Sequence, residues 1–132
     1  MRWLPTLIVT VSALTAGTEA KDLVDAIHAV ETSGRLGPIR GDGGAALGPL
    51  QIHKACWIDA NMPDGCYEDV SNLAYAKRVF ARYMARYATE RRLGRPVTDE
   101  DRARIWNGGP NGYKKSATNK YWAKVRKELT ND

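Results

Sequence analysis

Apolar residues recur with helical spacing in several stretches of the chain, and each stretch predicts a helix with one buried face. The first stretch covers residues 22–32 and has four apolar positions on one side: Leu23, Val24, Ile27 and Val30. Ser33-Gly34 should end this helix, because glycine readily leaves the helical conformation. We therefore expect an opening helix that finishes just after Glu31.

The longest predicted helix starts near Asp69 or Ser71, either of which can cap it, and runs to about Glu90. Its buried side consists of six residues: Leu73, Ala76, Phe80, Tyr83, Met84 and Tyr87. The break that follows contains Gly94 and Pro96. This helix is long enough to be the centre of the core.

Two further helices are predicted after this break. One begins at Thr98, which can form a capping box with Asp101, and ends at the glycine-rich turn of residues 107–110. The other is capped by Ser116, and its apolar side consists of Tyr121, Trp122, Val125 and Leu129. Both helices carry many charged residues on their remaining faces, as helices at a protein surface do.

The segment after the first helix follows a different pattern. Residues 34–48 contain six glycines, which favours loops or a short hairpin over long regular elements. Pro49 suits the first position of a helix, so a short helix is predicted over residues 50–58. Taken together, the pattern predicts a mainly α fold with about five helices and a short glycine-rich loop or β-hairpin after the first helix.

Residues 1–20 have the composition of a secretion signal. Arg2 supplies the basic end, residues 3–16 are mostly apolar, and the small residues Thr18 and Ala20 lie near the expected cleavage site. The apolar run is too short to span a bilayer comfortably, and no later segment is a candidate. We therefore expect a secreted or periplasmic protein without stable membrane insertion, and a domain that covers residues 21–132.

Export changes what the two cysteines should do, because disulfides persist outside the cytosol. Cys56 and Cys66 flank a turn-like segment, which predicts a disulfide between them, with two free thiols as the alternative. Closing so short a loop would contribute roughly 2–3 kcal/mol. No cluster of cysteine and histidine completes a metal site, so neither a metal nor another cofactor is expected.

The charge balance of the chain favours an anionic partner. It has 20 Lys and Arg against 15 Asp and Glu, a formal net charge of +5. Bacterial wall, lipid headgroups and nucleic acid would all attract such a protein. The basic residues are spread over several helices that also carry acids, and no nucleic-acid-binding motif is present, so nucleic acid is not the expected partner.

Two carboxylates near the glycine-rich segment are the best candidates for chemistry. Glu31 lies beside the apolar stripe at the carboxyl end of the first helix, where burial and the helix dipole both raise a carboxyl pKa. Asp42 is surrounded by glycines and should be solvated and ionised. One protonated and one ionised carboxyl suit general acid catalysis on a polymer held between them, an arrangement of which lysozyme is the general example. The ordinary alternatives are a surface glutamate and a turn-forming aspartate.

Three motifs occur in the same order as in the invertebrate-type (destabilase) lysozymes and resemble them. They are Ala29-Val30-Glu31-Thr32-Ser33-Gly34, Gly48-Pro49-Leu50-Gln51-Ile52, and the run from Arg104 through Asn107-Gly108-Gly109-Pro110-Asn111-Gly112 to Tyr113. The closing Tyr121-Trp122-Ala123-Lys124-Val125 is similar to the family's ending. The matches extend over most of residues 22–127. The same elements resemble, more loosely, the soluble lytic transglycosylases of the same superfamily.

This resemblance implies a monomeric muramidase with a lysozyme-like fold, whose groove accepts a peptidoglycan glycan strand. The enzyme would cleave the β-1,4 bond between N-acetylmuramic acid and N-acetylglucosamine. Glu31 matches the family's general acid, and Asp42 falls where the second carboxylate is expected, as nucleophile or as stabiliser of the oxocarbenium-like state.

The resemblance also implies a set of substrate-binding positions: Ser33, Gln51, His53, Asn107, Gly108 and Tyr113. For three of them an ordinary structural role is an open alternative. Asn107 could be a helix C-cap, Tyr113 a packed tyrosine, and His53 a surface histidine on the short helix.

The chain departs from the family pattern in ways that leave other functions open. It has only two cysteines, Trp106 stands where the family often has histidine, Tyr113 stands where it often has cysteine, and the loop that carries Asp42 is slightly shorter. A transglycosylase would use Glu31 alone as acid and then base, with Ser33 orienting the glutamate or the acetamido group of the substrate. A non-catalytic wall-binding module is the third reading.

Overall fold

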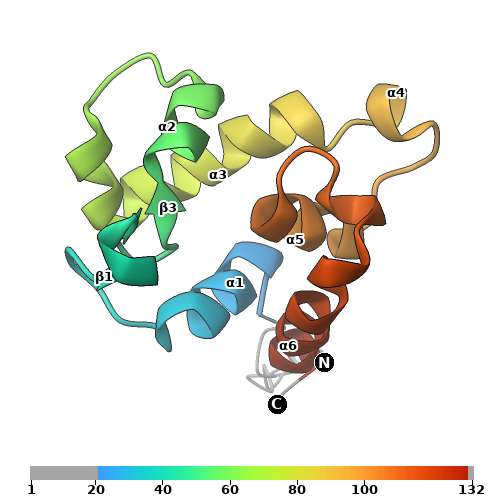
Figure 1. Ribbon diagram of the computed structural model, residues 1–132, viewed down its shortest axis with the longest axis horizontal. Helices are drawn as coiled ribbons and strands as arrows, with labels where there is room; N and C mark the ends of the chain where they lie inside the picture. The colour runs from blue at the N-terminus through green and yellow to red at the C-terminus, as the bar shows by residue number, and fades with distance from the viewer. Residues whose placement is uncertain (1–20, 131–132) are drawn as a thin grey trace, which may run out of the picture.

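The computed structural model describes residues 21–130, which form mainly helices with one small sheet (Figure 1). The α-helices are α1 (Leu23–Thr32), α2 (Lys54–Ala60), α3 (Leu73–Tyr87), α4 (Glu90–Leu93), α5 (Asp99–Gly108) and α6 (Asn119–Thr130). The strands are β1 (Arg40–Gly41), β2 (Ala46–Leu47) and β3 (Ile52–His53). This architecture confirms the predicted fold class. The predicted secretion signal, residues 1–20, lies outside the described residues.

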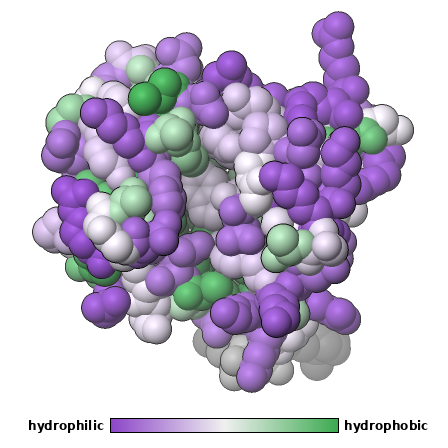
Figure 2. Space-filling view, in the orientation of Figure 1, coloured by the Kyte–Doolittle hydropathy of each residue, from purple (hydrophilic) through white to green (hydrophobic). Residues whose placement is uncertain are grey.

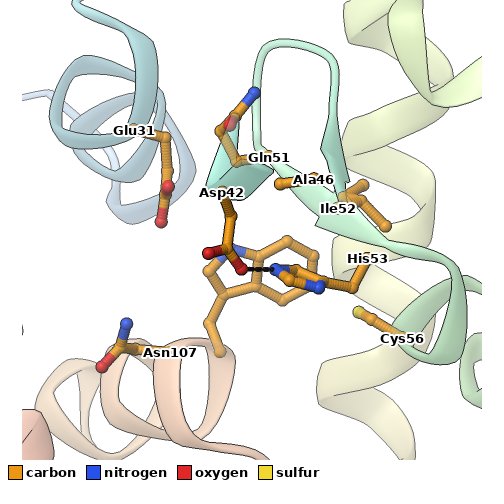
Figure 3. Close-up of a pocket in the computed structure, with 9 residues that line it drawn as sticks. Glu31, Asp42, Ala46, Gln51, Ile52, His53, Cys56 and Asn107 are labelled. Carbon is orange, nitrogen blue, oxygen red and sulfur yellow. Dashed lines mark ion pairs between the residues drawn. The ribbon is translucent and has the colours of Figure 1, made fainter. Parts of the chain in front are cut away.

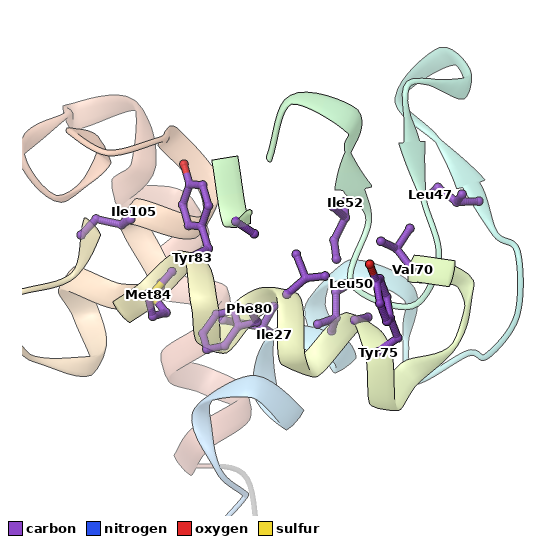
Figure 4. Packing of buried hydrophobic residues seen from close by; sticks show 14 of the residues in the cluster. Ile27, Leu47, Leu50, Ile52, Val70, Tyr75, Phe80, Tyr83, Met84 and Ile105 are labelled. Atoms are coloured by element: carbon purple, nitrogen blue, oxygen red, sulfur yellow. The ribbon is translucent and has the colours of Figure 1, made fainter. Parts of the chain in front are cut away.

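Helix α3 crosses the molecule and joins its two parts. On one side of it lie the sheet and α2, and on the other lie α5 and α6 (Figure 1). The apolar side of α3 contributes six buried residues to the core: Tyr75, Ala76, Val79, Phe80, Tyr83 and Met84. Figure 4 shows residues of other elements packed around them, including Ile27 of α1, Ile105 of α5, and Leu50. A single core therefore holds both sides of the molecule at fixed positions.

Capping residues fix the ends of the two helices that matter most for the site. Asp22 accepts a hydrogen bond from the Asp25 backbone N–H at the start of α1, and Ser33 ends this helix in the left-handed conformation with φ 56°. The predicted capping box of α5 is confirmed, since Thr98 and Asp101 each accept from the other's backbone N–H. Arg95 also donates to Asp101 and, with the Thr98 hydrogen bonds, lowers the pKa of that buried carboxyl to about 2.

The predicted helix over residues 50–58 was wrong in its start. Gln51 has a φ of 51°, which breaks any helix there, and Ile52–His53 pairs as β3 before α2 begins at Lys54. The left-handed backbone is held by the Gln51 side chain, whose amide donates to Ile39 O at 3.1 Å and to Gly48 O at 2.9 Å. A side chain that satisfies distant carbonyls in this way gives no periodic signal in the sequence.

The bounds of the later helices also differ from the prediction. Asn72, rather than Asp69 or Ser71, caps α3, because residues 67–71 form a 3₁₀ turn, η2 (Tyr67–Ser71). Helix α3 ends at Tyr87, and Thr89 caps the separate short helix α4, which raises the number of α-helices in residues 21–130 to six. Ser116 begins the 3₁₀ turn η4 (Ser116–Thr118), so α6 starts three residues later than its predicted cap.

The small sheet is a three-stranded antiparallel meander with the order β1-β2-β3. Its register pairs Gly41 with Ala46 and Ala46 with His53. The 3₁₀ turn η1 (Asp42–Gly44) joins β1 to β2. The alternate positions, Leu47 and Ile52, are each 1% exposed and belong to the core, which fixes the register of such short strands.

The two cysteines are free thiols, so the predicted disulfide is not formed in the structure. Cys56 lies inside α2 and is half-buried, whereas Cys66 is exposed and precedes η2, where its sulfur accepts a backbone hydrogen bond in a capping arrangement. Burial raises the pKa of the Cys56 thiol to about 12, and the nearby Asp59 adds to the effect. None of the helices within residues 21–130 is long and apolar enough to cross a membrane.

Candidate active site

A cleft of about 290 Å³ opens between the sheet side and the helical side of the molecule. It is visible in Figure 2 as a hollow surrounded mostly by hydrophilic residues. Residues from six elements and the turn before β3 line it: Glu31, Asp42, Ala46, Gln51, Ile52, His53, Cys56, Trp106 and Asn107. The cleft therefore draws on segments that lie as much as 76 positions apart in the sequence (from 31 to 107).

Glu31 enters the cleft from the last turn of α1 (Figure 3). Burial raises the pKa of its carboxyl above the ordinary value, while the Tyr121 hydrogen bond and the charge of Lys124 act in the opposite direction. The Tyr121 hydroxyl, from α6, donates to Glu31 Oε1 at 2.9 Å. Glu31 is thus a carboxyl in one fixed orientation that keeps its proton to higher pH than an exposed glutamate, which is what a general acid requires.

Asp42 lies on the opposite, sheet side of the cleft, at the start of η1. Its side chain is 70% exposed, and its carboxylate contacts the imidazole of His53, with Oδ2 and Nε2 3.2 Å apart (Figure 3). Its backbone has a φ of 52°, a conformation that aspartate tolerates better than most residues. The two cleft carboxyls therefore have different surroundings, one half-buried and one largely in water.

The Gln51 side chain closes the sheet side of the cleft. Besides its two hydrogen bonds to backbone carbonyls, it lies over Gly41, and a Cβ on Gly41 would collide with its amide oxygen. This is a physical reason for glycine at position 41. Gln51 donates both recorded hydrogen bonds within the protein, so the structure supports a role in shaping the groove.

The helical side of the cleft is built by consecutive residues of α5. The ring of Trp106 packs at a steep angle against Phe80 and Tyr83, with ring centroids 5.1 Å and 5.8 Å apart. Asn107 is exposed in the last turn and lines the cleft, and Figure 3 shows it below Glu31 in that view, across from Asp42 and His53. A held aromatic ring beside an exposed amide offers both an apolar surface and hydrogen bonds to a sugar.

The structure brings five of the eight predicted site residues together in this cleft: Glu31, Asp42, Gln51, His53 and Asn107. The other three lie elsewhere. Ser33 is the exposed C-cap of α1, Gly108 packs against the methyl group of Thr118, and Tyr113 is half-buried against the core in η3 (Gly112–Lys114). The structure gives these three local packing or capping roles.

Sequence reasoning did not assign four of the residues that line the cleft: Ala46, Ile52, Cys56 and Trp106. It also missed Tyr121 as the partner of Glu31, since those residues are 90 positions apart. The only available signal was position, because Trp106 directly precedes Asn107 and Cys56 lies one helical turn after His53. Nothing local in the sequence places Ala46 or Tyr121 at the site.

The fold and its cleft define a lysozyme-like domain. A crystal structure of Meretrix lusoria lysozyme in complex with Aeromonas hydrophila PliI superposes with a TM-score of 0.71 at 33% identity, over 80% of this chain and 86% of that chain. The crystal structure of Tapes japonica lysozyme gives a TM-score of 0.67 at 32% identity, over 77% of this chain and 84% of that one.

The Destabilase family model matches residues 22–128, and the chain belongs to this family. Lysozyme 1 of Crassostrea virginica is 42% identical over 87 residues, which is 65% of this chain and 46% of the relative. The invertebrate-type lysozyme of Ruditapes philippinarum is 38% identical over 86 residues, 64% of this chain and 62% of the relative. The matched segment thus spans less than two thirds of either curated relative.

Proposed function

We propose that the chain is a peptidoglycan hydrolase, a muramidase that cleaves the β-1,4 bond between N-acetylmuramic acid and N-acetylglucosamine. The observation that carries this proposal is the Glu31 carboxyl, whose pKa burial raises and which faces a cleft with an ionisable carboxylate, Asp42, on its other side. Membership of the Destabilase family and the likeness to bivalve lysozymes support it.

In this mechanism Glu31 donates its proton to the glycosidic oxygen as the bond breaks. The resulting carboxylate accepts the Tyr121 hydrogen bond at Oε1 and lies near the positive charge of Lys124, and both stabilise the ionised form. Asp42 provides negative charge to the oxocarbenium-like state, as nucleophile or as electrostatic stabiliser. Trp106 and Asn107 would contact the sugar rings, with Gln51 shaping the groove.

We also propose that the protein acts outside the cytosol, because its substrate is there. Support comes from residues 1–20, whose basic start, apolar run and small residues at the end match an export signal. Sequencing the amino terminus of the protein recovered from culture medium or periplasm tests this. A terminus near Lys21 is expected, and a protein that retains residues 1–20 would contradict export by cleavage.

The test of the muramidase proposal is Glu31→Gln, which keeps the size and the polarity of the side chain but cannot donate a carboxyl proton. Release of soluble fragments from purified peptidoglycan should fall by about 10³-fold, within the usual range for a lost general acid. Thermal unfolding should stay near that of the wild type. Glu68→Gln, at an exposed carboxyl outside the cleft lining, is the matched control and should remain active. A fully active Glu31→Gln protein would end the proposal.

A second candidate function is lytic transglycosylation by Glu31 alone. The 70% exposure of the Asp42 side chain favours it, since a single-glutamate mechanism needs no second carboxylate at a fixed place. Mass analysis of the fragments decides between the two: hydrolysis leaves a free reducing end, and transglycosylation leaves a 1,6-anhydro sugar. A wall-binding module without catalysis would instead bind purified wall and release no fragments.

A further inference from the structure

Asp42 lies on a turn in which few contacts hold its side chain in place. It begins a three-residue turn in which Gly43 and Gly44 follow with φ of 65° and 97°. Its side chain is 70% exposed, and within residues 21–130 the only side-chain partner recorded for its carboxylate is His53. A solvated carboxylate on a glycine turn would otherwise exchange among several rotamers, which is unsuitable for a group that must meet developing charge at one place.

The sheet explains how His53 reaches Asp42. Gly41, Ala46 and His53 are directly paired across the three strands, so their side chains share one face. Because Ala46 has only a methyl group on this face, the imidazole can extend from β3 across β2 toward the residue that follows β1. A larger residue at position 46 would fill this path. Ala46 thus has a geometric role in the contact.

His53 itself is anchored. Its backbone pairs in β3 and then becomes the N-cap of α2, and the preceding residue is held by the Tyr67 hydroxyl, which donates to Ile52 O at 2.6 Å. The imidazole is therefore attached to a fixed part of the backbone, while the carboxylate it contacts is attached to a turn. In such a pair the histidine sets the position of the aspartate rather than the reverse.

We propose that His53 is a positioning residue: through the 3.2 Å contact between its Nε2 and Asp42 Oδ2, it selects the rotamer that holds the second carboxylate toward the cleft. This rests on the proposed glycosidase function and deepens it, because it assigns His53 to Asp42 and not to the sugar. The other titratable groups that line the cleft are Glu31 of α1 and Cys56 of α2, and Lys54 follows His53 in the chain. Within residues 21–130, none of these three forms a hydrogen bond or an ion pair with the imidazole.

The kinetic test compares His53→Ala with His53→Gln, whose amide keeps an N–H donor. We expect His53→Ala to lower kcat about tenfold with KM changed less than about twofold, and His53→Gln to recover most of the loss. In an Asp42→Asn background, His53→Ala should cause no further loss. Lys54→Ala, at the exposed next residue outside the cleft lining, is the control and should retain activity. A raised KM with unchanged kcat, or equal losses with and without Asp42, would overturn the proposal.

A second measurement does not depend on activity. Because the Asp42 carboxylate lies beside Nε2, neutral His53 should carry its proton on Nε2, and the ¹⁵N shifts of the imidazole report this tautomer. Asp42→Ala should move these shifts toward a mixture of tautomers, whereas Glu31→Gln should not. Unchanged shifts in Asp42→Ala would refute the contact. If the shifts respond but the wild type releases no wall fragments, the muramidase proposal fails while the pairing of the two residues stands.

Discussion

The two sides of the cleft hold their carboxyls in opposite ways. On the helical side, Glu31 is half-buried at the end of α1, and a tyrosine from α6 fixes its orientation. On the sheet side, Asp42 is solvated on a turn between two-residue strands. Burial raises the pKa of the Glu31 carboxyl. The Asp42 carboxylate stays largely exposed, and its one side-chain contact within residues 21–130 is with His53. A single cleft can thus combine an acid whose pKa is raised by burial with a carboxylate that is positioned by one local side-chain contact.

The largest effect that separates the two sides should come from removing the charge of Asp42. For hydrolysis with two carboxylates, Asp42→Asn should lower fragment release by about 100-fold, because a stabilising negative charge at the oxocarbenium-like state is lost. Unfolding temperature should hardly change, since the side chain is 70% exposed. Near-normal activity together with 1,6-anhydro products would show that the sheet side takes no part in the chemistry and that Glu31 acts alone.

An intermediate effect is expected from Gly41→Ala, which disturbs only the sheet side. The new Cβ collides with the amide of Gln51, whose two hydrogen bonds to Ile39 O and Gly48 O would be lost. We expect a loss of about 1–3 kcal/mol in the free energy of unfolding, measured in urea, and about tenfold lower activity.

The control for Gly41→Ala is Gly94→Ala, at the end of α4. Gly94 has a φ of 75° and open space around its Cβ position, so alanine there should cost about 1 kcal/mol of backbone strain. Its activity at low temperature should stay unchanged. If both variants lost activity equally, global destabilisation, and not the shape of the sheet side, would explain the effect.

The smallest effect concerns the helical side and appears in the pH profile. Burial raises the pKa of Glu31, and the Tyr121 hydrogen bond lowers it, so Tyr121→Phe should raise that pKa further. The acid must be protonated to act, so activity is lost as pH rises through the pKa of Glu31. The alkaline limb of kcat should therefore move to higher pH, with a change in kcat at the optimum of only about a few-fold. Tyr113→Phe, outside the cleft lining, should leave the limb in place. A shift to lower pH would contradict this account of the acid.

Much of the helical frame could be predicted from the chain because it depends on local pattern. The extent of α1 and the capping box of α5 were confirmed, and so was the mainly helical class with a hairpin-like element after the first helix. The errors fell where a side chain bonds to the backbone without any periodic pattern in the sequence. Gln51 leaves the helical conformation to bond Ile39 and Gly48, and Asn72 takes the capping role that Asp69 and Ser71 were expected to share.

Local pattern was enough to predict the order of the elements, the position of Glu31 at a helix end and the position of Asp42 among glycines. Periodicity, capping and turn residues act within a few positions of the chain, so these features can be read from the sequence. The side chains that surround each carboxyl, in contrast, depend on contacts between segments that come together only in the folded chain. The Tyr121 hydroxyl on Glu31, the imidazole of His53 on Asp42 and the ring of Trp106 in the cleft all come from segments joined by the common core. Burial and hydrogen bonding between distant segments set a pKa and an orientation, and neither can be read from neighbours in the chain.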